Sequence, residues 1–310
     1  MTKQNINVAL IGNPNTGKTS VFNQLTGLNQ QVGNYPGITV EKKVGFCKLA
    51  HNINANIIDL PGTYSLNASS ADESVVIELL LNKNDKLFPD VIVVVSEVEN
   101  LKRNLLLFTQ IKDLEIPTIL VINMIDRMKL KGISLDIPFL EEHLKTKIVL
   151  VSSRKNIGIE ELKTAITTYK TITTEACLNA SSIDDDYFNT LRKTFPNQSL
   201  YKLWLVITQD VNFADLNRNT LENESFTKSK SELKKLQQKE TIKRYQFIND
   251  TLKTGLNIDS SIATDFRSKL DRILTHKVWG YLIFFVVLFG IFQSIFEWSK
   301  IPMDFIDSSF

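Results

Sequence analysis

An eight-residue stretch near the start of the chain has the residue types of a phosphate-binding loop. Residues 12–19 read GNPNTGKT and fit the pattern G-x-x-x-x-G-K-[ST] without a mismatch. Glycines let the backbone turn tightly, so that successive N–H groups can surround anionic oxygens. Lys18 would reach the outer phosphates, and the Thr19 hydroxyl would bind Mg²⁺, which prefers oxygen ligands. The pattern therefore predicts a nucleotide site.

Two further motifs extend this prediction to the metal and the base. Residues 59–62 read DLPG, in which Asp59 could hold Mg²⁺ through a water and the Gly62 N–H could bond the terminal phosphate. Residues 123–126 read NMID, in which Asn123 would brace the loop. Asp126 can accept two hydrogen bonds from guanine, whereas adenine would leave a buried carboxylate unpaired. The motifs predict GTP or GDP as the ligand and leave an ATPase as a weak alternative.

Two looser segments complete the expected site. Ser152 and Ser153 follow an apolar run, where backbone groups usually read the guanine oxygen. The loop 33–39 carries Thr39, whose hydroxyl could close on Mg²⁺ only when the terminal phosphate is present, as an order–disorder switch. The expected metal ligands are Thr19, Thr39 and, through water, Asp59. The expected nucleotide-binding residues are Gly12, Asn13, Asn15, Thr16, Gly17, Lys18, Thr19, Ser20, Gly37, Ile38, Thr39, Asp59, Gly62, Asn123, Met124, Asp126, Ser152 and Ser153.

Hydrolysis would depend on positioning more than on covalent chemistry. Ras-like GTPases usually carry a glutamine directly after the D-x-x-G glycine, and here that position is Thr63. We therefore predict slow hydrolysis, with Lys18, Thr39, Gly62 and Asn15 as the catalytic candidates. The Asn15 carbonyl oxygen could reach the phosphates beside a monovalent cation, so potassium activation is expected. A nucleotide-binding module with negligible turnover stays open as an alternative.

The motifs need elements that place them at one edge of a sheet. Apolar runs at 6–11, 40–49, 55–60, 91–95, 118–123 and 147–151 alternate with helix-compatible stretches at 18–25, 73–81, 101–112, 136–144 and 158–168. Such alternation predicts an α/β fold with a parallel sheet covered on both faces. Runs 40–49 and 55–60 are joined by a short turn, so we expect six strands, of which one antiparallel strand forms an edge.

The second half of the chain has a different character. Strand patterns stop near residue 170, and residues 171–274 are expected to form a helical domain. Residues 278–296 carry no charge, which predicts a transmembrane helix over 278–298. Basic residues just before it place its N-terminal side in the cytoplasm. The net charge of +2 does not indicate a nucleic-acid binder.

Several of these segments together resemble the N-terminal part of FeoB-type ferrous iron transporters. The likeness covers nearly the whole chain and includes a methionine, Met124, where ordinary guanine-binding motifs carry lysine. The matching segments are GNPNTGKTSVFNQLTG at 12–27, VGNYPGITVEKKVG at 32–45, DLPGTYSL at 59–66, ENLKRNLLL at 99–107, NMIDRMK at 123–129, RYQFI at 244–248 and DRILTHKVWGYLIFF at 271–285.

The resemblance implies a Ras-like G domain at 1–170, a helical spacer at 171–274, one membrane span, and the start of a permease at 299–310. GTP, GDP and Mg²⁺ would be its cofactors, with potassium as a further candidate. It implies that the G domain lies on the cytoplasmic side of the bacterial inner membrane and regulates iron uptake. The implied partners are the membrane, the rest of a permease and, as further candidates, a small cytosolic Feo accessory protein and a second copy of the chain.

Length separates the chain from this family, because the sequence ends at Phe310 after one expected span. We therefore expect a truncated form or a fragment of a longer frame. A competing interpretation is a soluble-type GTPase that acts on ribosomes, in which the last apolar segment would be a buried helix.

Overall fold

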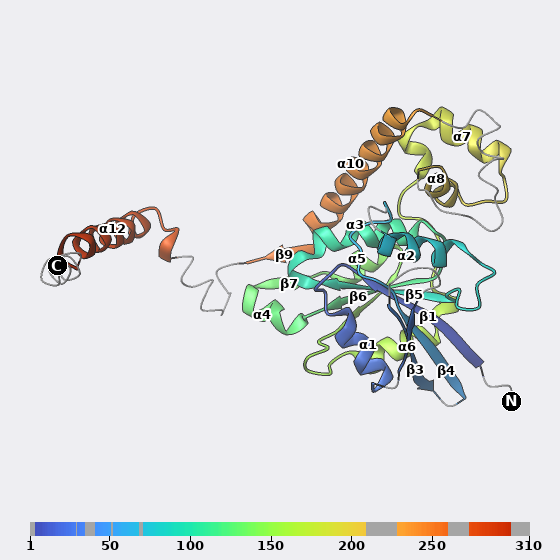
Figure 1. The fold of residues 1–310 in the computed structure, drawn as a ribbon, viewed down its shortest axis with the longest axis horizontal. Coiled ribbons are helices and arrows are strands. Elements are labelled where there is room, and N and C mark those ends of the chain that lie inside the picture. The colour runs from blue at the N-terminus through green and yellow to red at the C-terminus, as the bar shows by residue number, and fades with distance from the viewer. Residues whose placement is uncertain are drawn as a thin grey trace, which may run out of the picture. The chain divides into compact units, whose positions relative to one another are not determined.

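The computed structural model describes residues 4–28, 30–34, 41–50, 52–67, 71–208, 228–259 and 273–298. In this part of the chain seven strands form one sheet, in the order β2-β3-β4-β1-β5-β6-β8 (Figure 1). Their bounds are β1 (Gln4–Gly12), β2 (Gln30–Asn34), β3 (Glu41–Ala50), β4 (Ile53–Asp59), β5 (Val91–Glu97), β6 (Thr118–Asn123) and β8 (Lys147–Leu150).

Most of the sheet is parallel, as predicted. β1 pairs in parallel with β4 and β5, β5 with β6, and β6 with β8. The central strands are buried, because their continuous apolar runs meet helices on both faces. The carboxyl ends of β1, β4, β5 and β6 therefore lie at the same edge, where the predicted motifs begin.

The antiparallel edge differs from the prediction. β3 pairs with β4 in antiparallel fashion, but it is not an edge strand, because β2 pairs antiparallel with its other side. The sheet thus has seven strands instead of six. β2 reads QQVGN, which carries neither a buried-strand run nor a clear alternation, so only pairing with β3 identifies it as a strand.

Helices cover both faces of the sheet (Figure 1). α1 (Lys18–Thr26) and α6 (Ile159–Thr167) pack with alternate residues of the central strands in one apolar core. The opposite face carries α2 (Ala71–Leu81) and α3 (Leu101–Lys112), as Figure 1 shows. α4 (Met128–Lys131) and α5 (Ile137–Leu144) lie between β6 and β8 in the chain. The helix starts and ends agree with the predicted helices to within about two residues.

The later helices have their own core. α7 (Asp185–Thr194), α8 (Leu200–Thr208) and α10 (Lys230–Gly255) surround the fully buried Trp204, whose ring lies 5.5 Å from that of Phe188. Ser229 and Glu232 form a capping box that begins α10. These helices belong to the same compact unit as the sheet, 1–128 with 134–257, so the predicted domain boundary at residue 170 stays a prediction.

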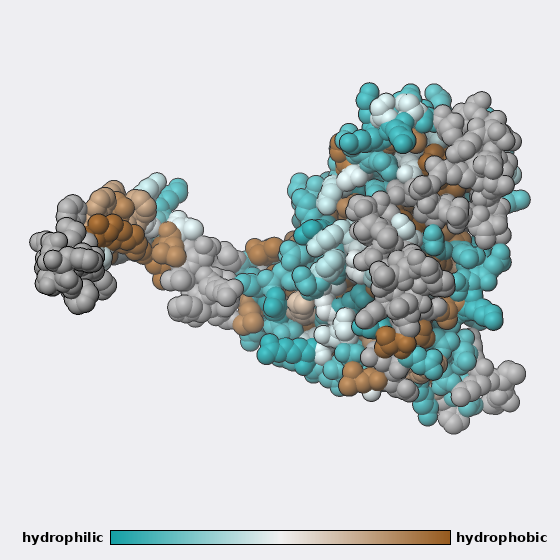
Figure 2. All heavy atoms as spheres, in the orientation of Figure 1, coloured by the Kyte–Doolittle hydropathy of each residue, from teal (hydrophilic) through white to brown (hydrophobic). Residues whose placement is uncertain are grey.

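A second unit comprises residues 129–133 and 258–310 and contains α12 (Trp279–Trp298). β7 (Ile133–Leu135) and β9 (Leu256–Ile258) form a small separate sheet. α12 is a helix where the transmembrane segment is predicted, and most of its described apolar side chains are exposed, as its brown surface shows in Figure 2. Among the described residues, however, no helix has both the length and the apolar character to cross a membrane.

Candidate functional site

The predicted phosphate loop joins β1 to α1 and has the backbone of a tight anion-binding turn. Gly17 has φ 82° and caps α1, and Asn15 has φ 67°. A Cβ at Gly17 would overlap the side-chain nitrogen of Asn123, and one at Gly12 would overlap the carbonyl oxygen of Val95. Both positions therefore require glycine, as the pattern predicts.

The charged residues of the first two motifs meet beside this loop. Lys18 and Asp59 form an ion pair, and their side chains are only 12% and 9% exposed. Thr19, at the first turn of α1, is exposed, as are Asn15 and Ser20. A cation beside a nest of backbone N–H groups suits phosphate, and the oxygens of Thr19 and Asp59 suit Mg²⁺. The residues present therefore fit a nucleotide with its metal.

The D-x-x-G turn after β4 packs directly on the phosphate loop. Leu60 N–H donates to the Leu10 carbonyl at 3.0 Å, and Thr63 N–H donates to the Gly12 carbonyl at 3.3 Å. A Cβ at Gly62 would lie 3.5 Å from Pro14. The buried Thr63 hydroxyl donates to the Ser65 carbonyl at 2.8 Å. The residue at the usual water-positioning place therefore directs its hydroxyl toward its own loop.

Asn123, at the end of β6, links the two loops that are predicted to hold the phosphates and the base. It is fully buried, and its Nδ2 donates to the Thr16 carbonyl at 3.0 Å and to the Ser153 hydroxyl at 3.2 Å. Its Oδ1 accepts from the Ser153 N–H at 3.1 Å. Gln24 of α1 adds a bond to the Ser153 carbonyl at 3.2 Å. The predicted bracing role of Asn123 thus has a geometric basis.

Asp126 has a partner that the sequence did not indicate. The Ser152 hydroxyl donates to Asp126 Oδ1 at 2.6 Å, although we expected only backbone groups of Ser152 to contribute. This hydrogen bond lowers the pKa of Asp126, because it stabilises the carboxylate. Met124 adopts φ 64° and starts the turn that carries Asp126. The hydrogen bond therefore favours the ionised carboxylate, the form that accepts hydrogen bonds.

The structure brings together the predicted residues on four loops, at 12–20, 59–62, 123–126 and 152–153. It does not test the predicted switch residues Gly37, Ile38 and Thr39, because residues 35–40 lie outside the described residues. Besides the Ser152 hydroxyl, sequence reasoning also missed Gln24, whose amide has no motif of its own.

A buried ionic cluster joins α3 to α10. Arg244 lies 2.8 Å from Asp113 through Nη2 and donates through Nε to Glu240 at 2.8 Å. Glu240 also accepts from Trp204 Nε1 at 2.8 Å. Asp113 and Arg244 are 3% and 2% exposed. Burial raises the pKa of Asp113, and the neighbouring Arg244 opposes this. The cluster ties the helical segment to the helix that follows β5.

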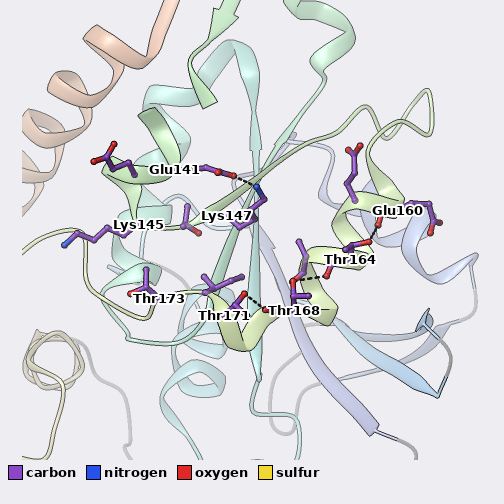
Figure 3. A pocket seen from close by; sticks show the side chains of 13 residues that line it. Glu141, Lys145, Lys147, Glu160, Thr164, Thr168, Thr171 and Thr173 are labelled. Atoms are coloured by element: carbon purple, nitrogen blue, oxygen red, sulfur yellow. Dashed lines mark hydrogen bonds and ion pairs between the residues drawn. The ribbon is translucent and has the colours of Figure 1, made fainter. Parts of the chain in front are cut away.

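A cavity of about 810 Å³ lies elsewhere, between α5 and α6 at the outer edge of β8 (Figure 3). Glu141 accepts from the Ile148 N–H at 2.9 Å and pairs with Lys147 at 2.8 Å, so its carboxylate caps part of the strand edge. Of the predicted site residues that the structure describes, none lines this cavity. Its lining mixes acidic, basic and threonine side chains, a set that indicates no particular ligand.

Comparison with known proteins gives a consistent result. Residues 6–166 match the family described as ferrous iron transport protein B. The Fe(2+) transporter FeoB of Leptospira biflexa is 35% identical and covers 97% of the chain, which spans 45% of that protein. A Fe(2+) transport protein A/FeoB fusion protein of Porphyromonas gingivalis is 32% identical over 98% of the chain and 38% of its own length.

Solved structures agree in fold. The cytosolic domain of the T. maritima FeoB iron transporter in its apo form has a TM-score of 0.72 and 29% identity, covering 82% of this chain and 100% of that one. Its GMPPNP form has a TM-score of 0.71 at 29% identity, over 82% of this chain and 99% of that one. The chain thus spans less than half of the transporters that it matches, and nearly all of their solved cytosolic domains.

Proposed function

The chain belongs to the ferrous iron transport protein B family, and on this premise we propose that it binds GTP and hydrolyses it slowly to regulate ferrous iron uptake. One observation carries the proposal. Asn123 ties the phosphate loop to the loop that holds Ser153, while Asp126 stands ionised beside Ser152. A base and a phosphate chain would therefore meet complementary groups on one rigid edge of the sheet.

The proposed ligand assignment follows the chemistry of these groups. The phosphates would lie against the N–H groups of 12–19, with Lys18 moving from Asp59 to the terminal phosphates. Mg²⁺ would take the Thr19 hydroxyl and, through water, Asp59, and the predicted switch residue Thr39 would complete this site. When bound, the metal would neutralise charge that develops on the phosphates.

Slow turnover is proposed because Thr63 offers no side chain to the attacking water. Its hydroxyl donates to Ser65, so backbone groups would have to orient the water. Asn15 stands exposed on the phosphate loop in a left-handed conformation, which suits a carbonyl ligand to a potassium ion beside the phosphates. A nucleotide-sensing module with negligible turnover is the second candidate, and the orientation of Thr63 favours it.

The wider role rests on the relatives. They are named as Fe(2+) transporters, so we propose that this chain acts at the bacterial inner membrane, with its G domain in the cytoplasm and with a permease region as its partner. The fusion with transport protein A in one relative supports a small Feo accessory protein as a further partner. A second copy of the chain is another proposed partner, and only the family resemblance supports it.

Phosphate release from GTP tests the proposal. We expect the chain to bind GTP and GDP more tightly than ATP. Phosphate release should be slow in potassium and slower still when sodium replaces potassium. Equal rates in the two salts would contradict the role of Asn15. Binding without measurable release in either salt would favour the sensing module, and absence of guanine-nucleotide binding would overturn both.

A further inference from the structure

One polar side chain of the phosphate loop is buried and has no hydrogen-bond partner among the described residues. Asn13 is 2% exposed, and neither its Oδ1 nor its Nδ2 has a hydrogen-bond partner among the described residues. Its own carbonyl is satisfied, since it accepts from the Thr16 hydroxyl at 2.9 Å. A buried amide without a partner loses its hydrogen bonds to water and gains none in the protein, which is unfavourable in free energy. Such a group therefore needs a specific explanation.

A second unpaired group lies at the neighbouring place in the sheet. Gly12, the last residue of β1, pairs with Val95, so Asn13 directly after β1 and Ser96 of β5 are the next residues along the two segments. Ser96 is fully buried, and its hydroxyl also lacks a partner among the described residues. Val91, Val93 and Val95 belong to the core beneath α1 and α6, so Ser96 faces the opposite side of the sheet.

The D-x-x-G turn at 59–63 lies against the phosphate loop on both sides of Asn13, since Thr63 bonds Gly12 and a Cβ at Gly62 would lie 3.5 Å from Pro14. It is held at Thr63 by the Gly12 carbonyl, and at Leu66, whose N–H donates to Gln110 of α3 at 2.9 Å. The bond from Thr63 N–H to Gly12 is long, at 3.3 Å, and involves the residue next to Asn13. When the Gly62 N–H turns toward a terminal phosphate, the adjoining Thr63 N–H must also move.

We propose that Asn13 is a positioning residue for this turn: its carboxamide accepts the Thr63 N–H when a triphosphate is bound, in place of the Gly12 carbonyl. The inference rests on the proposed GTP binding. The exchange replaces the long 3.3 Å bond to the Gly12 carbonyl by a bond to a buried amide oxygen, and this difference favours the triphosphate state over the diphosphate state. A ligand shifts such an equilibrium only through a difference of this kind.

Asn13→Ala tests the inference, with Asn104→Ala as the matched control. Asn104 is equally buried, but its Oδ1 already accepts from the Glu97 N–H at 2.8 Å. We expect Asn13→Ala to keep the Tm of the nucleotide-free chain, and to lower the affinity for a non-hydrolysable GTP analogue relative to GDP by about ten-fold. Asn104→Ala should lower the Tm and leave that ratio unchanged.

Two results would overturn the inference. One is that Asn13→Ala leaves the ratio of analogue to GDP affinity unchanged. The other is that Asn13→Ala lowers the Tm as much as Asn104→Ala does, which would mean that the Asn13 amide is already paired in the nucleotide-free chain. If Asn13→Ala does not fold, the NMR resonance of the Asn13 side-chain amide in the unaltered chain is the second measurement. It must shift between the GDP complex and the analogue complex, and an unchanged resonance would overturn the inference. Failure of the unaltered chain to bind either nucleotide would instead overturn the proposed function.

Discussion

The side-chain amide of Asn123 donates a hydrogen bond to the backbone carbonyl of Thr16 at 3.0 Å, across 107 residues of sequence. This bond fastens the end of β6 to the phosphate loop. The same side chain holds Ser153 through both of its polar atoms. Three loops of the proposed nucleotide site, each after a different strand, are therefore fixed relative to one another, which would lower the ordering cost of binding.

Asn123→Ala should weaken guanine-nucleotide binding by about ten- to one-hundred-fold, because each buried group left without its partner costs about 1–3 kcal/mol. Isothermal titration with GDP measures the change. Asn56→Ala is the matched control, since Asn56 Nδ2 bonds Asn7 at 3.0 Å within the strands and not at the loops. Equal losses in the two variants would show that the effect is one of general stability.

Gly17→Ala should abolish tight nucleotide binding and lower the Tm. A Cβ there would meet the Asn123 side chain, and its left-handed backbone alone costs an L-residue about 1–2 kcal/mol. Gly27 also has a left-handed backbone, with φ 59°, but nothing lies within 4 Å of its Cβ position. Gly27→Ala should therefore lower the Tm modestly and keep GDP affinity. Loss of affinity in both variants would contradict the assigned role of Gly17.

Asp126→Asn should weaken GTP binding by about 10⁴-fold and favour XTP, because an amide cannot accept both guanine donors. Competition between GTP and XTP in filter binding measures the preference. Asp90→Asn serves as control, because Asp90 accepts from the Asn7 N–H at 2.8 Å, away from the site loops. An unchanged GTP preference in Asp126→Asn would mean that another group reads the base.

Ser152→Ala should raise the pKa of Asp126, since the hydrogen bond from Ser152 is the main cause of its lowered pKa. The sign follows from linkage: a lowered folded pKa contributes stability above the unfolded pKa of about 3.9, and this is lost as the pH falls through the folded value. Carbon-13 titration of the Asp126 carboxylate measures the shift. An unmoved pKa would show that the Ser152 contact does not persist in solution.

Asp113→Ala should lower the free energy of unfolding by about 3–5 kcal/mol, because it removes one of the two carboxylates that pair with the buried, charged Arg244. Urea unfolding measures this loss. Arg127→Ala provides the comparison, since Arg127 is 47% exposed and pairs with Glu99 at 2.9 Å. Such an exposed pair contributes about 0–1 kcal/mol. Similar losses in the two variants would contradict a buried, paired Asp113.

Sequence patterns located the elements of the sheet well where the apolar run was long. β6 and α3 begin and end at the predicted residues, because a buried strand requires a continuous apolar run and an amphipathic helix requires apolar residues at helical spacing, and both patterns are visible in the sequence. β2 was missed, since QQVGN has no such period and becomes a strand only by pairing with β3. α12 forms where the membrane span is predicted, while among the described residues no helix has both the length and the apolar character to cross a membrane.

The sequence by itself determined the motifs, their order and the edge of the sheet where they gather, because each motif follows a strand at a fixed short distance. Only the tertiary structure decided which side chains meet there. The hydroxyl of Ser152 reaches Asp126, Arg244 reaches Asp113, and the buried side chain of Asn13 has no partner among the described residues. These relations join residues far apart in the chain, and their geometry is set by packing between elements, which no local period records.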